Sequence, residues 1–74
     1  MNIKLKLARV EKNLSQQELA DRVSASRQTI GLIESGNYNP SLDLCRRIAR
    51  ALGKSLDQLF WEENDADQST KLSD

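Results

Sequence analysis

Apolar residues recur along the chain at the spacing of an α-helix, and five segments show this pattern. In the first, Ile3, Leu7 and Val10 lie at i, i+4 and i+7, which predicts a helix with one apolar face that ends near Asn13. The apolar positions of the other segments are Leu19, Ala20 and Val23; Ile30 and Ile33; Leu42, Leu44, Cys45, Ile48, Ala49 and Leu52; and Leu56, Leu59, Phe60 and Trp61. Since no segment has the pattern of a long strand, we predict an all-α fold, a compact five-helix bundle.

Small polar residues and glycines mark where these helices begin and end. Ser15 with Glu18 three residues later is the capping-box pattern, in which the hydroxyl and the carboxylate each accept a first-turn backbone N–H. The candidate caps of the third, fourth and fifth helices are Ser26, Ser41 and Ser55, and the glycines that end the third and fourth are Gly36 and Gly53.

The second and third helices are separated only by a tight turn at Ser24 and Ala25. Ala20 is small enough to let the two helices cross closely. We expect Ser24 to adopt a left-handed backbone that glycine would adopt more easily, at a cost on the order of 1 kcal/mol. Two short helices joined in this way are the layout of a helix-turn-helix, whose second helix lies in the DNA major groove.

The third helix presents Arg27, Gln28, Gly31, Leu32 and Ser35 outward. Arginine can bind guanine through O6 and N7, glutamine can bind adenine through N6 and N7, and a leucine can contact a thymine methyl group. Glycine inside a helix is unfavourable by up to about 1 kcal/mol relative to alanine. Two explanations are equally good for Gly31: close approach of this helix to DNA, or neutral drift at an exposed site.

Residues that flank this helix are candidates for contacts with the DNA backbone. Gln16 lies in the first turn of the second helix, where backbone amides and a side chain together can hold a phosphate. Asn37, Tyr38 and Asn39 follow the third helix and are placed to contact the same strand. For Tyr38, phosphate contact and packing within the loop are equally good alternatives.

The formal net charge of the 74 residues is zero, but the charges are unevenly distributed. Residues 1–61 contain ten Lys and Arg against six Asp and Glu, whereas residues 62–74 contain five Asp and Glu against one Lys. We therefore predict a mildly basic DNA-binding domain over residues 1–61 and an acidic, disordered tail over residues 62–74.

The composition also narrows the class of protein and its compartment. With no histidine, one cysteine and no glycine-rich phosphate loop, the chain offers no nucleophile–base pair and no metal cluster. We therefore expect no enzyme and no cofactor. The single Cys45 cannot form an internal disulfide, and there is no secretory signal and no apolar run long enough to span a membrane. We expect a cytoplasmic protein without a membrane partner.

Five short motifs together resemble the phage repressor/Cro-like (XRE-type) helix-turn-helix family, and within it the small single-domain bacterial transcriptional regulators. The motifs are Ser-Gln-Gln-Glu-Leu-Ala at 15–20, Ser-Arg-Gln-Thr-Ile at 26–30, Ile-Glu-x-Gly at 33–36, Asn-Pro-Ser-Leu at 39–42 and Ile-Ala-x-Ala-Leu-Gly at 48–53. The resemblance covers about residues 3–61 and implies a five-helix domain that binds double-stranded operator DNA as a homodimer.

The resemblance also implies roles for particular residues. Arg9 and Glu34 match a pair that forms an internal salt bridge, and a short β pairing of residues 1–3 with residues 60–62 occurs in small relatives. Gln16 and Gln17 would approach the DNA backbone, and the residues that would approach the bases are Arg27, Gln28, Thr29 and Leu32. Together with the positions argued above, the candidate DNA-contacting residues are Gln16, Gln17, Ser26, Arg27, Gln28, Thr29, Leu32, Asn37, Tyr38 and Asn39.

These patterns favour a sequence-specific DNA-binding transcriptional regulator, most simply a repressor that binds a two-fold-related operator through the third helix. The alternative from another class is an antitoxin or adaptor that uses the same fold mainly for protein–protein interaction. A separate regulatory protein stays open as a further partner, and the sequence names neither the operator nor an inducing signal.

Overall fold

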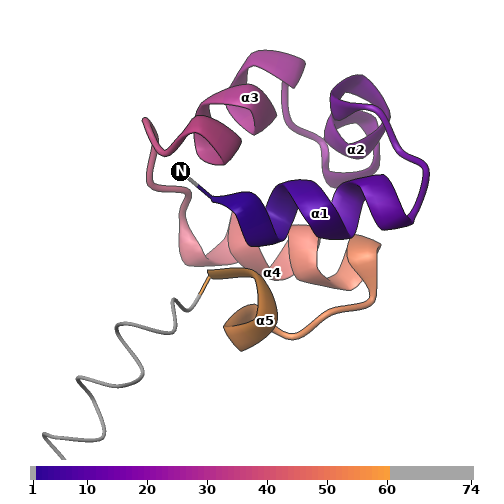
Figure 1. Ribbon diagram of the computed structural model, residues 1–74. Coiled ribbons are helices and arrows are strands. Elements are labelled where there is room, and N and C mark those ends of the chain that lie inside the picture. The colour runs from indigo at the N-terminus through magenta and orange to yellow at the C-terminus, as the bar shows by residue number, and fades with distance from the viewer. Residues whose placement is uncertain (1, 61–74) are drawn as a thin grey trace, which may run out of the picture.

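The computed structural model describes residues 2–60, and these form five helices without a strand (Figure 1). The helices are α1 (Ile3–Glu11), α2 (Gln16–Val23), α3 (Arg27–Ser35), α4 (Leu42–Leu52) and α5 (Leu56–Phe60). The predicted all-α, five-helix fold is confirmed. The predicted terminal β pairing finds no support at Asn2, which caps α1, or at Ile3 and Phe60, which lie in helices. Its other residues, 1, 61 and 62, are outside the described part, as is the predicted acidic tail.

Serine side chains begin four of the helices, α2 to α5, as the sequence predicts. In the capping box of α2, Ser15 Oγ accepts the backbone N–H of Glu18 at 3.0 Å, and Glu18 Oε1 accepts the backbone N–H of Ser15 at 2.7 Å. The hydrogen bond from the Ser15 backbone N–H, followed by one from the Ser15 side chain, lowers the pKa of the Glu18 carboxyl because both stabilise its charged form. Ser26, Ser41 and Ser55 accept the backbone N–H three residues ahead in the same manner.

Left-handed residues end three of the helices. Gly36 and Gly53 close α3 and α4 with φ angles of 84° and 67°, where glycine has no Cβ to clash. Ser24 closes α2 at φ 59° and ψ 43°, so the left-handed turn expected at this position is present with a serine in it.

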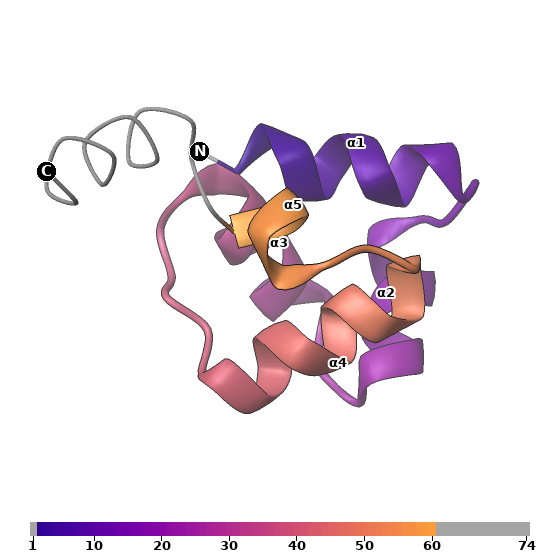
Figure 2. The ribbon, with the colours of Figure 1, turned by 90° about the horizontal axis from the view of Figure 1, so that it is seen from below.

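The core lies where α2 meets α3 and α4, and where α5 fills the space between α1 and α4 (Figure 2). Its largest fully buried side chains come from every helix: Leu5, Leu19, Val23, Ile30, Ile48, Leu52 and Leu59. Each such side chain contributes about 1.5–3 kcal/mol relative to an exposed one. No helix within residues 2–60 has the length and apolar character needed to cross a membrane.

The face of α1 that packs inward is not the one predicted. Ile3, Leu7 and Val10 are 49%, 58% and 52% exposed, whereas Leu5 and Ala8 are buried. The prediction was wrong because the inward face also contains Arg9, which periodicity counts as polar and which is buried through an ion pair. Leu42, expected in the apolar face of α4, is likewise 67% exposed at the first turn of that helix.

Candidate nucleic-acid interface

The connection between α2 and α3 is short and held by backbone hydrogen bonds. After Ser24, the backbone N–H of Ala25 donates to the carbonyl of Ala20 at 2.9 Å, and α3 begins two residues later. Ala20 has no exposed surface, in agreement with a small residue at the helix crossing. From α4, Arg47 Nη1 donates to the carbonyl of Val23 at 2.7 Å. The end of α2 is therefore held both by the turn that follows it and by α4.

One face of α3 is left open by this packing. Ile30 and Ile33 point into the core, while Arg27 and Gln28 are exposed and Leu32 is 37% exposed. Since a helix advances by about 100° per residue, the three open side chains share one side of α3 with Gly31 and Ser35. The structure thus brings together three of the four residues predicted to contact base edges; the fourth, Thr29, lies to one side of them.

Ser26 and Thr29 hold the start of α3 in place. Ser26 Oγ accepts the Thr29 backbone N–H at 3.1 Å, and their hydroxyl oxygens lie 2.9 Å apart. Thr29 is half-buried, to one side of the open face. This pair holds the first turn of α3, which carries Arg27 and Gln28, in a fixed conformation. DNA contact by either hydroxyl stays a prediction.

The two glutamines at the start of α2 have different surroundings. Gln17 is exposed, and its Nε2 donates to Asp21 Oδ1 at 2.8 Å, one helical turn along. Gln16 is half-buried, and its Nε2 donates to Glu34 Oε1 at 3.1 Å, which connects α2 to the end of α3. The bond between Gln16 and Glu34 was not foreseen from the sequence.

Glu34 receives this bond as part of a buried ion pair. Arg9 Nε donates to Glu34 Oε2 at 2.7 Å, Arg9 Nη2 donates to Glu34 Oε1 at 3.2 Å, and Arg9 Nη1 donates to the carbonyl of Leu14 at 2.7 Å. The two charged side chains are only 11% and 5% exposed. The salt bridge that the family resemblance implied between Arg9 and Glu34 is present, and it ties α1 to the end of α3.

The loop after α3 is open to solvent. Asn37 donates from its backbone to the carbonyl of Leu32 at 2.9 Å and from its side chain to Ser35 Oγ at 3.0 Å. Tyr38 is 46% exposed and Asn39 is exposed. The exposed ring of Tyr38 favours its availability to a partner over packing within the loop.

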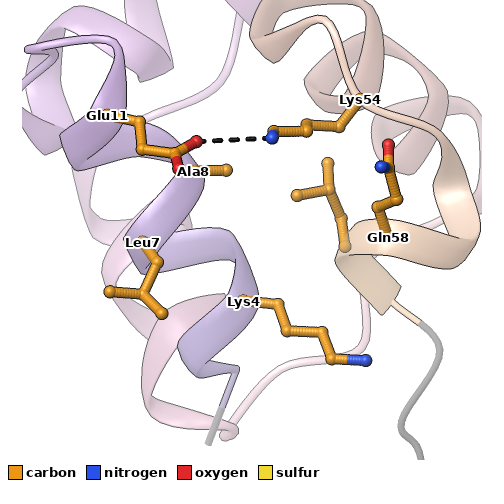
Figure 3. Close-up of a pocket in the computed structure, with 7 residues that line it drawn as sticks. Lys4, Leu7, Ala8, Glu11, Lys54 and Gln58 are labelled. Carbon is orange, nitrogen blue, oxygen red and sulfur yellow. Dashed lines mark ion pairs between the residues drawn. The ribbon is translucent and has the colours of Figure 1, made fainter.

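A groove of about 310 Å³ lies between α1 and α5, bridged at one end by the ion pair of Lys54 Nζ with Glu11 Oε1 at 3.3 Å (Figure 3). Its lining is Lys4, Leu7, Ala8, Glu11, Lys54, Gln58 and Leu59. These side chains are aliphatic, amide or singly charged, and none is a hydroxyl or thiol nucleophile.

The fold defines the class of the protein: a helix-turn-helix protein in which one face of the second helix of the motif, α3, is exposed. Comparison with known sequences agrees with this class, because the helix-turn-helix family model matches residues 5–59. The chain belongs to this family, whose curated members are transcriptional regulators.

Similar sequences occur in archaea and in a bacteriophage. An uncharacterized HTH-type transcriptional regulator of Methanocaldococcus jannaschii is 45% identical over 65 residues, which are 88% of this chain and 98% of the relative. One from Methanothermobacter thermautotrophicus is 50% identical over 58 residues, 77% of this chain and 84% of the relative. The immunity repressor protein of Bacillus phage phi105 is 37% identical over 60 residues, 81% of this chain and 42% of the relative.

Among solved structures, the restriction-modification controller protein C.AhdI from Aeromonas hydrophila is similar, with a TM-score of 0.73 and 35% identity. The similarity covers 77% of this chain and 86% of the controller protein. Together with the sequence matches, this similarity supports the assignment of the chain to the helix-turn-helix transcriptional regulators.

Proposed function

We propose that this protein is a repressor that binds a two-fold-related DNA operator as a homodimer, with α3 in the major groove. The observation that carries the proposal is the open face of α3, where Arg27, Gln28 and Leu32 stand together at the end of a fixed turn. The major groove of B-DNA is about 12 Å wide and admits one α-helix with its outward side chains against the base edges.

In this proposal the open face of α3 reads the DNA sequence. Arg27 donates to guanine O6 and N7, Gln28 pairs with adenine N6 and N7, and Leu32 contacts a thymine methyl group. The capping bonds of Ser26 and Thr29 support this role, because they order the first turn of α3 before DNA is bound.

The contacts that fix the register come from both flanks of α3. The first turn of α2 directs its free backbone N–H groups and the side chains of Gln16 and Gln17 to a phosphate. The loop that follows α3 contacts the same backbone strand with Asn37, Tyr38 and Asn39, whose exposure supports the proposal. Ser26 contributes a further DNA contact from the start of α3, and Thr29 approaches a base from beside the open face.

The homodimer and the repressor activity rest on simpler arguments. Two copies related by a two-fold axis can place their α3 helices in successive major grooves, about 34 Å apart along one side of the duplex. Repression requires only that the bound dimer occupy a promoter, and one similar protein is named an immunity repressor. The family match over residues 5–59 supports placing the DNA-binding unit within residues 1–61.

The test is a fluorescence-anisotropy titration with a duplex obtained by selection from random DNA and with a scrambled duplex. Arg27→Ala should reduce the preference for the selected duplex by about 1–3 kcal/mol, because one bidentate base contact is lost. Arg46→Ala is the matched control, since it removes the same charge from an exposed position of α4. Equal loss of preference in both variants, or no preference in the unmodified protein, would contradict the proposal.

A further inference from the structure

The amide group of Gln16 lies directly above Gly31 of α3. A Cβ atom built on Gly31 would be 3.7 Å from Gln16 Oε1 and 3.8 Å from Gln16 Nε2. Beyond Gly31, the Nε2 of Gln16 donates to Glu34 Oε1 at 3.1 Å. The absence of a side chain at Gly31 leaves open the path by which Gln16 reaches from α2 to Glu34, across the face that we assign to DNA.

Glu34 determines which way round the Gln16 amide lies. An ionised carboxylate only accepts hydrogen bonds, so the amide must turn its NH₂ group, not its oxygen, toward Glu34. The carboxylate cannot move to suit the other orientation, because Arg9 binds both of its oxygens, at 2.7 and 3.2 Å. One N–H of Gln16 Nε2 thus donates to Glu34. The second N–H is on the same nitrogen, and Gln16 itself is half-buried at the start of α2.

We propose that Glu34 is the positioning residue for the phosphate contact of Gln16, an inference that rests on the proposed function. Glu34 holds the amide so that its remaining N–H, and not its oxygen, faces the DNA backbone. Preorganising this flexible side chain removes much of the entropy that would be lost on binding. Arg9 makes the arrangement compatible with DNA, because its charge neutralises the carboxylate that lies close to the phosphate.

The first experiment measures the affinity of single and double variants for the selected duplex, at a temperature where circular dichroism shows each variant folded. Gln16→Ala should weaken binding about tenfold, as expected for one hydrogen bond to a charged group. In Glu34→Gln, Arg9 keeps the carbonyl oxygen and the new NH₂ group faces Gln16, which inverts the Gln16 amide. We expect a similar loss from Glu34→Gln and no further loss when both changes are combined.

Gln17→Ala is the matched control for this coupling. Gln17 bonds to Asp21 and not to Glu34, so its effect on affinity should add to that of Glu34→Gln. Non-additive loss for Gln16 with additive loss for Gln17 is the expected result. Additive loss for both pairs would overturn the positioning role while leaving the DNA-binding function intact; an unmodified protein without preference for any duplex would overturn both.

A second variant tests the same idea without disturbing the buried ion pair. In Gly31→Leu, the new side chain occupies the space of the Gln16 amide, so binding should weaken as much as in Gln16→Ala. Gly31→Ala places only a Cβ at ordinary contact distance from the Gln16 amide and should weaken binding less than Gly31→Leu. If Gly31→Leu weakens binding further in the Gln16→Ala background, the leucine obstructs the DNA directly and the positioning role is overturned.

Discussion

Replacement of Arg9 by methionine is the most severe test of how this fold is held together. The variant keeps most of the aliphatic volume of the arginine but removes three hydrogen bonds, two to Glu34 and one to the carbonyl of Leu14. The Glu34 carboxylate, on a side chain only 5% exposed, then keeps its hydrogen bond from the Gln16 amide but has lost its counter-charge. A buried charge without its counter-charge is strongly destabilising.

The expected loss is about 3–5 kcal/mol, the range for breaking one side of a buried ion pair. For 74 residues, the total free energy of unfolding should be about 4–11 kcal/mol, at roughly 0.05–0.15 kcal/mol per residue. Arg9→Met therefore removes a large share of the stability. The double variant Arg9→Met with Glu34→Leu should recover much of it, because both charges are gone and apolar groups fill the site.

Urea denaturation followed by circular dichroism at 222 nm measures these changes. The slope of the unfolding free energy against urea should stay the same in all variants, so that a shift in midpoint reports stability. A loss below about 1 kcal/mol for Arg9→Met, the value typical of an exposed pair, would refute the reasoning that burial makes this ion pair critical.

Three further predictions concern Gly31, the two faces of α1, and Glu18. Gly31→Ala should stabilise the fold by up to about 1 kcal/mol, raising the melting temperature by roughly 4–8 °C, since the new Cβ meets no clash; an unchanged or lower melting temperature would contradict this. Leu7→Gln, at an exposed position, should alter stability by no more than about 0.5 kcal/mol, whereas Leu5→Ala, in the core, should cost about 2–5 kcal/mol. If urea denaturation showed the larger loss for Leu7→Gln, the face of α1 predicted from periodicity would be the buried one. The pKa of Glu18 is lowered in the folded state, so the stabilisation by its ionised form is present above the unfolded pKa and is lost as the pH falls through the folded pKa. Stability measured against pH below about 5 should therefore fall less in Glu18→Gln than in the unmodified protein, and parallel curves would argue against the capping box as the cause.

Local signals in the sequence predict most of this fold. The serine caps and the glycines Gly36 and Gly53 interact with backbone groups only a few residues away in the chain. The helix ends can therefore be predicted from the sequence without knowledge of the tertiary contacts. The inward face of α1 could not be predicted in this way. Its assignment depends on Arg9, which becomes a buried residue only through a partner 25 residues away in the chain.

The candidate site likewise has one part that local sequence patterns predict and one part that they do not. The open face of α3 follows from helical periodicity, because Ile30 and Ile33 identify the buried side and leave Arg27 and Gln28 on the other. The bond from Gln16 to Glu34 joins two helices and depends on a missing side chain between them, so no local pattern indicates it. The glycine in the middle of α3, which periodicity alone leaves unexplained, was the available signal.

The central claim is that α3 reads a DNA sequence, and selection of bound duplexes from a randomised pool tests it most directly. The unmodified protein should enrich a two-fold-symmetric site with half-sites about one helical turn apart, and Arg27→Ala and Gln28→Ala should relax the preference at individual base pairs. Weak, salt-sensitive binding without enrichment of any sequence would contradict the claim.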